Sequence, residues 1–251
     1  MTLPRKAARL AVFIDADNAS PQMAEAIFDE IAKLGEAGVR RIYGDFSSPN
    51  LRGWNEILME YALLPQTQPA YTKGKNSSDI ALVIDAMDLL HKGGFDGFCL
   101  VSSDSDFTRL ASRVREEGVA VYGFGQEKTP VSFRRACTGF IFTENLASEK
   151  PEGQEPKPAE RQPPSKAVPL IMKALEQASE SPDIWVNLGQ VGTQLAKLAP
   201  DFDARTYGHK QLHMLVEKTG AFETRKDGNH IVIRRKPAKA AQAKKAPPKQ
   251  K

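Results

Sequence analysis

The sequence contains few cysteines and histidines and no long apolar run. The two cysteines, Cys99 and Cys137, lie in apolar surroundings, so we expect buried thiols and a reducing, cytoplasmic compartment. No apolar stretch approaches the roughly 20 residues that a membrane helix needs. The basic N-terminus is followed by a short apolar run that ends at Asp15, which argues against a signal peptide. His209, His213 and His230 lack the spacing of metal ligands.

Charge is distributed unevenly along the 251 residues. Residues 1–150 hold 17 basic and 20 acidic side chains, a net charge of −3, whereas residues 151–251 hold 18 and 11, a net charge of +7. An acidic first part and a basic second part suggest separate tasks. A basic segment raises the local affinity for a polyanion such as RNA or DNA, although a lysine-rich segment can also serve solubility alone.

Acidic side chains follow a strongly apolar stretch in the middle of the chain. Residues 98–101 (FCLV) have the composition of a buried strand, and the next five residues, Ser102 to Asp106, are polar. A helical pattern begins at Phe107. A helix cap needs one such residue, so the run of five favours a functional role for Asp104 and Asp106 over capping alone. Ligands of open α/β sheets bind where such strands end.

A second apolar stretch near the N-terminus repeats this pattern. Residues 10–14 (LAVFI) lead into Asp15 and Asp17, with Asn18 beside them. Two neighbouring parallel strands would bring the carboxylates of both stretches together. Crowded carboxylates repel one another, and a shared proton or a bound cation relieves that repulsion. Hard oxygen ligands favour Mg²⁺ or Mn²⁺.

Strand and helix patterns alternate through the first part of the chain, which predicts a parallel sheet with helices on both faces. Gly123 and Gly125 allow close backbone approach at the last residues of one strand. A helix over residues 79–90 begins with an acidic side chain, Asp79. Its place favours either a functional role or a favourable charge at a helix N-terminus. Asp85 and Asp88, further along this helix, are expected on a solvated face.

The second part of the chain has a different organisation. Residues 147–167 contain five prolines and many charges, which predicts a disordered linker. Asp227-Gly228 between two short strand patterns is a strong hairpin signal. Three helical patterns precede it, at residues 168–178, 185–198 and 205–218. Together they predict a winged helix-turn-helix domain over 168–235, followed by a basic disordered tail over 236–251 with six lysines.

Three motifs, taken in order, resemble the NYN domain of the PIN-like ribonucleases, whose bacterial forms are also called LabA-like or DUF88. They are FIDADN (13–18), KGKNSSD (73–79) and LVSSDSDF (100–107). The resemblance covers residues 8–146 and implies a PIN-like, Rossmann-like fold. The second domain resembles the LOTUS (OST-HTH) domain, a winged helix, through YGHKQLHMLVEK (207–218) and FETRKDGNHIVIR (222–234).

The resemblance implies a metal-dependent ribonuclease. Asp15, Asp79, Asp104 and Asp106 would be the catalytic metal ligands, supported by Asp17, Asn18, Ser102 and Ser103. One or two Mg²⁺ or Mn²⁺ ions would activate a water for attack on RNA, leaving a 5′-phosphate and a 3′-hydroxyl. The residues expected to contact RNA are Lys73, Lys75 and Arg109 in the first domain and Tyr207, His209, Lys210, Arg225 and Lys226 in the second.

Two other functions compete with this one. Asp15-x-Asp17 after a strand is the arrangement of haloacid dehalogenase-type phosphatases, but Ala19 stands where that family has Thr or Val, and no lysine directly precedes Asp104. The second alternative is a non-catalytic RNA-binding adaptor. Between residues 169 and 235 the chain carries 9 basic and 8 acidic side chains, so the winged domain could bind either RNA or a protein partner.

Overall fold

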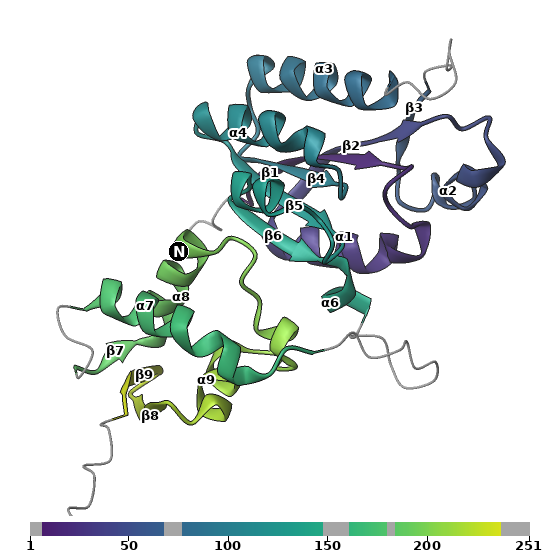
Figure 1. The fold of residues 1–251 in the computed structure, drawn as a ribbon. Coiled ribbons are helices and arrows are strands. Elements are labelled where there is room, and N and C mark those ends of the chain that lie inside the picture. Colours follow the sequence, from purple (N-terminus) through teal and green to yellow (C-terminus); the bar gives the residue numbers. More distant parts are fainter. Residues whose placement is uncertain (1–6, 68–76, 148–160, 180–183, 237–251) are drawn as a thin grey trace, which may run out of the picture.

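The computed structural model describes residues 7–67, 77–147, 161–179 and 184–236 (Figure 1). An α/β domain is followed by a smaller winged domain. Most of the predicted linker, the predicted tail after Lys236, and the predicted RNA contacts Lys73 and Lys75 lie outside the described residues. Within these ranges, no helix is long and apolar enough to cross a membrane.

The first domain is built on a parallel sheet, which confirms the predicted fold class. In the described chain it has six strands in the order β3-β2-β1-β4-β5-β6. They are β1 (Arg9–Asp15), β2 (Glu36–Gly44), β3 (Leu64–Thr67), β4 (Gly97–Val101), β5 (Ala120–Gly125) and β6 (Gly139–Phe142). The strand order changes direction between β1 and β4. The carboxyl ends of these two strands therefore form a topological switch point, where open α/β sheets bind ligands.

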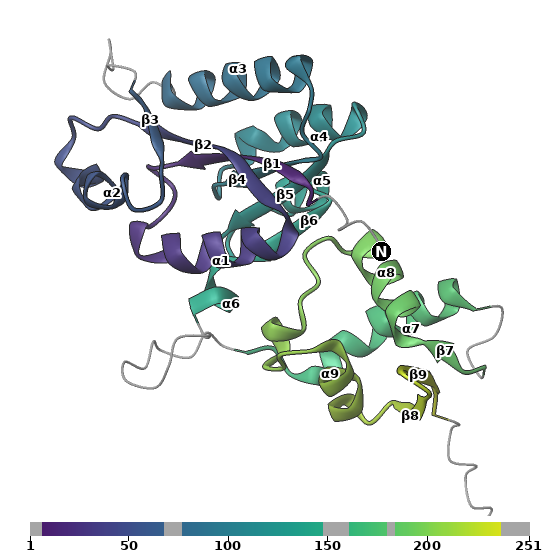
Figure 2. The ribbon, with the colours of Figure 1, turned by 180° about the vertical axis from the view of Figure 1, so that it is seen from behind.

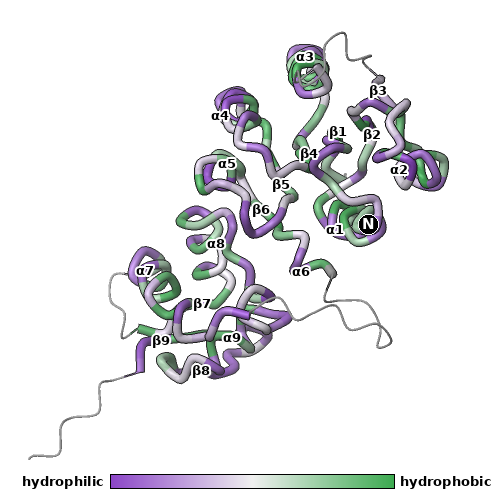
Figure 3. Tube along the Cα trace, turned by 45° about the vertical axis from the view of Figure 1, so that its right-hand side comes forward, coloured by the Kyte–Doolittle hydropathy of each residue, from purple (hydrophilic) through white to green (hydrophobic). Residues whose placement is uncertain are grey.

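Helices cover both faces of this sheet (Figure 3). On one face lie α1 (Ala24–Leu34), α2 (Arg52–Ile57) and α6 (Thr143–Ala147), and on the other α3 (Ser77–Lys92), α4 (Thr108–Glu116) and α5 (Val131–Ala136). Val12 and Ile14 of β1 pack on the α1 side, whereas Phe13 packs on the α3 side. Burial of both faces explains why β1 and β4 are nearly continuous apolar runs rather than alternating ones.

Short 3-10 helices join several of these elements: η1 (Pro21–Met23), η2 (Pro49–Leu51) and η3 (Ser105–Phe107). Each directly precedes a helix: α1, α2 and α4 in turn. Each therefore completes the turn that leads from the carboxyl end of a strand into a helix on a face of the sheet.

The second domain is a winged helix, as predicted from its three helical patterns and its hairpin. Its elements are η4 (Pro164–Ala167), α7 (Val168–Ala178), β7 (Val186–Asn187), α8 (Leu188–Leu198), η5 (Ala204–Tyr207), α9 (Leu212–Thr219), β8 (Phe222–Asp227) and β9 (His230–Arg235). In the described residues β7, β9 and β8 form an antiparallel sheet. The predicted helix over 205–218 is interrupted at Gly208, whose φ of 80° is left-handed and ends η5 before α9 begins.

The last residues of the predicted linker belong to this domain instead. Pro164–Ala167 form a 3-10 helix, and the side chain of Ala167 is fully buried. The backbone N–H of Gln162 donates to the carbonyl of Thr206. Proline is well tolerated in the first turn of a helix, so the proline-rich composition that suggested disorder is compatible with an ordered start here.

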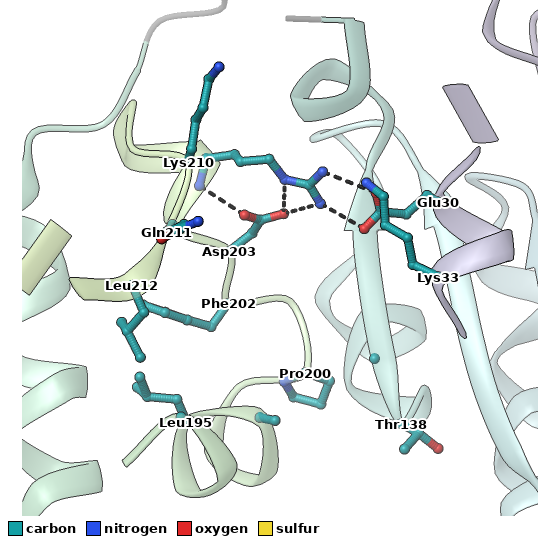
Figure 4. A pocket seen from close by; sticks show the side chains of 15 residues that line it. Glu30, Lys33, Thr138, Leu195, Pro200, Phe202, Asp203, Lys210, Gln211 and Leu212 are labelled. Atoms are coloured by element: carbon teal, nitrogen blue, oxygen red, sulfur yellow. Dashed lines mark hydrogen bonds and ion pairs between the residues drawn. The ribbon is translucent and has the colours of Figure 1, made fainter. Parts of the chain in front are cut away.

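The two domains contact each other through the segment between α8 and α9 (Figures 2 and 4). The guanidinium of Arg205 donates to both carboxylate oxygens of Glu30 on α1, at 3.2 Å each, and also pairs with Asp203. The N–H of Phe140, on the outer edge of β6, donates to the carbonyl of Pro200 at 2.8 Å. Two further links across the junction are the Arg134–Asp201 ion pair and the Asn145–Thr206 hydrogen bond.

This junction holds charged groups that are largely removed from water. The side chains of Arg205 and Glu30 are 15% and 14% exposed. Burial alone would raise the pKa of Glu30, but the hydrogen bonds from Lys33 and Arg205 outweigh it and lower that pKa. A cleft of about 500 Å³ lies beside the pair, lined by both domains. The docked domain also shields the free edge of β6, which would otherwise be open to another strand.

We predict that Arg205→Met uncouples the two domains. The substitution leaves Glu30 half-buried without this partner, at a cost of about 2 kcal/mol, between the values for exposed and buried pairs. Scanning calorimetry should then resolve two unfolding transitions in the variant and a single one in the wild type. Arg113→Met removes an arginine from exposed pairs within α4 and serves as the control. Identical scans for the two variants would contradict this role of Arg205.

Candidate active site

Asp15 lies at the carboxyl end of β1 and is buried, with 1% of its surface exposed. One carboxylate oxygen accepts hydrogen bonds from the side-chain amide of Asn18 at 2.8 Å and from the hydroxyl of Ser102 at 2.7 Å. The other accepts from the backbone N–H of Asp17 at 3.2 Å. These bonds fix the carboxylate in place, while burial raises its pKa above the ordinary value for aspartate.

Ser102 connects Asp15 to the loop after β4. Its N–H donates to the carbonyl of Phe124, which extends the pairing of β4 with β5 by one residue. Its hydroxyl oxygen also accepts from the N–H of Asp104 at 3.0 Å. A Cβ on Gly125 would lie only 2.6 Å from the carbonyl oxygen of Ser102, which confirms the predicted close approach at this glycine.

The loop after β4 positions Asp104 and Asp106 at the start of η3. The side chain of Asp104 accepts from the N–H of Asp106 at 2.8 Å and so caps this helix. Asp104 is half-buried and Asp106 is exposed. Ser103 accepts from the N–H of Gln126, which ties this loop to the one after β5. Asp104 therefore caps η3 and is also one of the acids that gather at this end of the sheet.

Asp79, in the first turn of α3, stands in electrostatic contact with the other acids. Its pKa is raised from 3.8 to about 6, first by burial and then by the negative charges of Asp15, Asp104, Asp17 and Asp106. The fold thus gathers carboxylates from β1, the loop after β4 and the start of α3 at one edge of the sheet. These five acids form what we call the carboxylate cluster.

Asp85, which was expected on a solvated face, instead contacts the sheet. Its carboxylate accepts from the hydroxyl of Tyr43 at 2.8 Å and pairs with Arg41 at 2.8 Å. Both partners belong to β2, and Tyr43 lies beside Asp15 in the pairing of β1 with β2. Burial and this hydrogen bond raise the pKa of Tyr43. Asp85 therefore anchors α3, the helix that carries Asp79, against the sheet.

The chemistry of the carboxylate cluster suits a hard divalent cation. Its donors are carboxylate and hydroxyl oxygens, which such ions prefer. Among the described residues, however, no three His, Cys, Asp or Glu side chains form a preassembled metal site. The main influences on the pKa of Asp15 and of Asp79 include burial and other acids, and no cationic side chain is among them. The acids therefore influence one another electrostatically. A bound cation would neutralise the negative charge that they concentrate.

The other residues singled out from the sequence are dispersed. Arg109 is exposed on α4. Tyr207 is half-buried, 5.9 Å from the ring of Phe202, in the segment that docks onto the first domain. His209 is half-buried, and Lys210 lines the cleft between the domains. Arg225 and Lys226 are exposed on β8.

Comparison with known proteins divides the chain in the same way. The NYN domain profile matches residues 9–146, and the OST-HTH/LOTUS domain profile matches residues 161–233. No curated protein matches the chain.

Two solved structures are similar to parts of the chain. A Vibrio parahaemolyticus protein of unknown function is 18% identical, with a TM-score of 0.47, covering 56% of this chain and 96% of that one. An uncharacterized Nitrosomonas europaea protein is 33% identical, with a TM-score of 0.27, covering 37% of this chain and 90% of that one.

We predict that Asp79→Asn stabilises the protein in EDTA at pH 7.5. A folded-state pKa near 6 lies above the ordinary 3.8, so the charged form destabilises the fold. With allowance for solvent screening, the gain is about 1 kcal/mol, or roughly 2–4 °C in melting temperature.

Thermal melts at several pH values test the sign of this effect. The advantage of Asp79→Asn should be full above about pH 6.5 and should shrink as the pH falls toward 4, because Asp79 of the wild type becomes neutral over this range. Asp88→Asn, exposed on the same helix, should change the melting temperature little at any pH. If Asp79→Asn were less stable than the wild type at pH 7.5, the proposed repulsion between Asp79 and the other acids would be contradicted.

Proposed function

Because this chain belongs to the NYN-domain family and carries a C-terminal OST-HTH/LOTUS domain, we propose that it is a metal-dependent ribonuclease. The observation that carries the proposal is the carboxylate cluster at the switch point between β1 and β4. Open α/β sheets bind ligands at such points, and NYN domains are PIN-like nucleases as a rule. The haloacid dehalogenase arrangement would require Thr or Val in place of Ala19 and a lysine directly before the acids that follow β4, and this chain has neither.

Each residue of the cluster has a distinct task in this proposal. Asp15, oriented by Asn18 and Ser102, would be the fixed ligand of Mg²⁺ or Mn²⁺. Asp79, Asp104 and Asp106 would complete the ligand set, and Asp17 would add negative charge beside it. When bound, such an ion supplies charge neutralisation at the scissile phosphate and a more acidic attacking water. Ser103 would hold the loop after β4 in place, because its hydroxyl oxygen accepts from the N–H of Gln126.

The same chain would also hold the RNA. Arg109 on α4 is exposed and follows Asp106 by three residues, so it can reach a phosphate beside the cluster. Lys73 and Lys75 precede Asp79 in sequence and would act in the same way. Hydrolysis in line with the leaving group would give a 5′-phosphate and a 3′-hydroxyl, as in PIN-like nucleases. The C-terminal domain would bind RNA, a function associated with LOTUS domains.

A non-catalytic RNA-binding adaptor is the second candidate. The specific observation in its favour is that the described carboxylates do not form a preassembled metal site. Acids that influence one another electrostatically without forming a metal site are also compatible with a domain that binds RNA and does not cleave it. Binding without cleavage is therefore a defined outcome of the test.

The test compares two Asp→Asn variants that flank the same strand. Asp104 follows β4, whereas Asp96 precedes it at the opposite edge of the sheet. Labelled single-stranded and hairpin RNA are incubated with Mn²⁺, Mg²⁺ or EDTA. We expect metal-dependent cleavage by the wild type and by Asp96→Asn, and a loss of roughly a hundredfold or more in Asp104→Asn. Asparagine can still cap η3, so the local fold is retained.

Three results would count against the ribonuclease. Equal loss of cleavage in both variants would place the effect outside the carboxylate cluster. RNA binding without cleavage under every condition would favour the adaptor. Release of phosphate from a small phosphomonoester in place of RNA cleavage would favour the phosphatase chemistry.

A further inference from the structure

The positive charge of the C-terminal domain is concentrated on its wing, which we define as residues 222–236. The wing holds five basic side chains, Arg225, Lys226, Arg234, Arg235 and Lys236, against two acidic ones. The preceding residues 169–221 hold five basic and six acidic side chains. The near-neutral total of the domain therefore conceals a segment with a net charge of +3.

Trp185 contacts two basic side chains of the wing. Trp185 directly precedes β7, which pairs with β9. The guanidinium carbon of Arg225 lies 4.4 Å from the centre of the indole ring, and that of Arg234 lies 4.6 Å from it. Both distances are well within the range of cation–π attraction. Arginines on β8 and β9 thus meet at an aromatic side chain that directly precedes β7.

The two arginines differ in their other partners. Arg234 also pairs with Glu223 through two of its nitrogens, at 2.7 and 2.6 Å. Arg225 is exposed, and within the described ranges no carboxylate pairs with it. Stacking on Trp185 restrains the long Arg225 side chain while its planar set of N–H donors stays accessible. A donor group restrained in this way loses less conformational entropy when it binds an anion.

The wing remains accessible in the docked arrangement of the domains. Contacts with the first domain come from the segment around Pro200 to Thr206. In both ribbon views, β8 and β9 lie at the end of the C-terminal domain away from the parallel sheet (Figures 1 and 2). A ligand on the wing therefore meets no obstruction from the catalytic domain.

We propose that Trp185, Arg225 and Arg234 form a binding site for the phosphate backbone of single-stranded RNA. The proposal deepens the RNA-binding role given above for the C-terminal domain, and it rests on that role. Guanidinium groups match phosphate oxygens with paired hydrogen bonds. Two guanidinium groups held at one aromatic ring, in a segment with five basic and two acidic side chains, fit a ligand that repeats its negative charge along a strand better than a single acidic group. Trp185 acts here as a positioning residue for Arg225.

Binding of a uridine oligonucleotide to the full chain in EDTA tests the site without requiring cleavage. We expect Arg225→Ala to weaken binding several-fold at low salt. It should also reduce the slope of log K against log salt concentration by about 0.7, the value for one lost phosphate contact to a single strand. Lys173→Ala removes one exposed positive charge from α7 and should leave the slope unchanged.

Tryptophan fluorescence provides a second readout, because the chain has two tryptophans and Trp54 is buried in the first domain. RNA should change the emission of the wild type and should leave that of Trp185→Phe unchanged. Trp185→Phe retains a smaller aromatic ring under Arg225 and should weaken binding less than Arg225→Ala does.

Equal affinity and slope for Arg225→Ala and the wild type would overturn the site, as would an emission unchanged by bound RNA. If an acidic peptide changed the emission and RNA did not, the wing would be a protein-binding surface. Because cleavage is measured separately, a ribonuclease with an inert wing would refute this proposal alone.

Discussion

The hydrogen bond from the Ser102 hydroxyl to the buried carboxylate of Asp15 is the contact on which the candidate site depends. It crosses from β4 to β1 at the point where the order of the parallel strands changes direction. Ser102 at the same time accepts from the N–H of Asp104, so one side chain joins the acid at the end of β1 to an acid of the loop after β4. Burying a carboxylate is costly, and the bonds from Ser102 and Asn18 offset part of that cost.

The surrounding fold holds this arrangement from several sides. Helices cover both faces of the sheet, and Asp85 joins α3 to Tyr43 and Arg41 of β2, which holds Asp79 at the same edge. The C-terminal domain docks on β6 and α1 through half-buried charge pairs and leaves its wing exposed. In this account, cleavage and one mode of RNA binding occupy separate surfaces of one docked unit.

Much of this could be predicted from the sequence because the signals are local. The apolar runs ending at Asp15 and Ser102, the Asp227-Gly228 turn and the order of strands and helices all depend on near neighbours in the chain. The role of Asp85 and the stacking on Trp185 depend on residues distant in sequence, and no periodicity reveals such pairs. Gly208 interrupted a continuous helical pattern, and prolines that suggested disorder begin a helix at Pro164.

The most direct test of the central claim is calorimetric titration of Mn²⁺ into the metal-free protein and into Asp15→Asn. The amide oxygen of asparagine can still accept from Ser102 and Asn18, whereas its NH2 group cannot accept from the N–H of Asp17. The variant therefore removes the charge and keeps the hydrogen bond between the two strand ends. The account predicts that the wild type binds Mn²⁺ and that Asp15→Asn binds it at least tenfold more weakly, a loss of about 1.4 kcal/mol or more. Equal binding by both proteins, or none by the wild type, would contradict a metal site built on the carboxylate cluster.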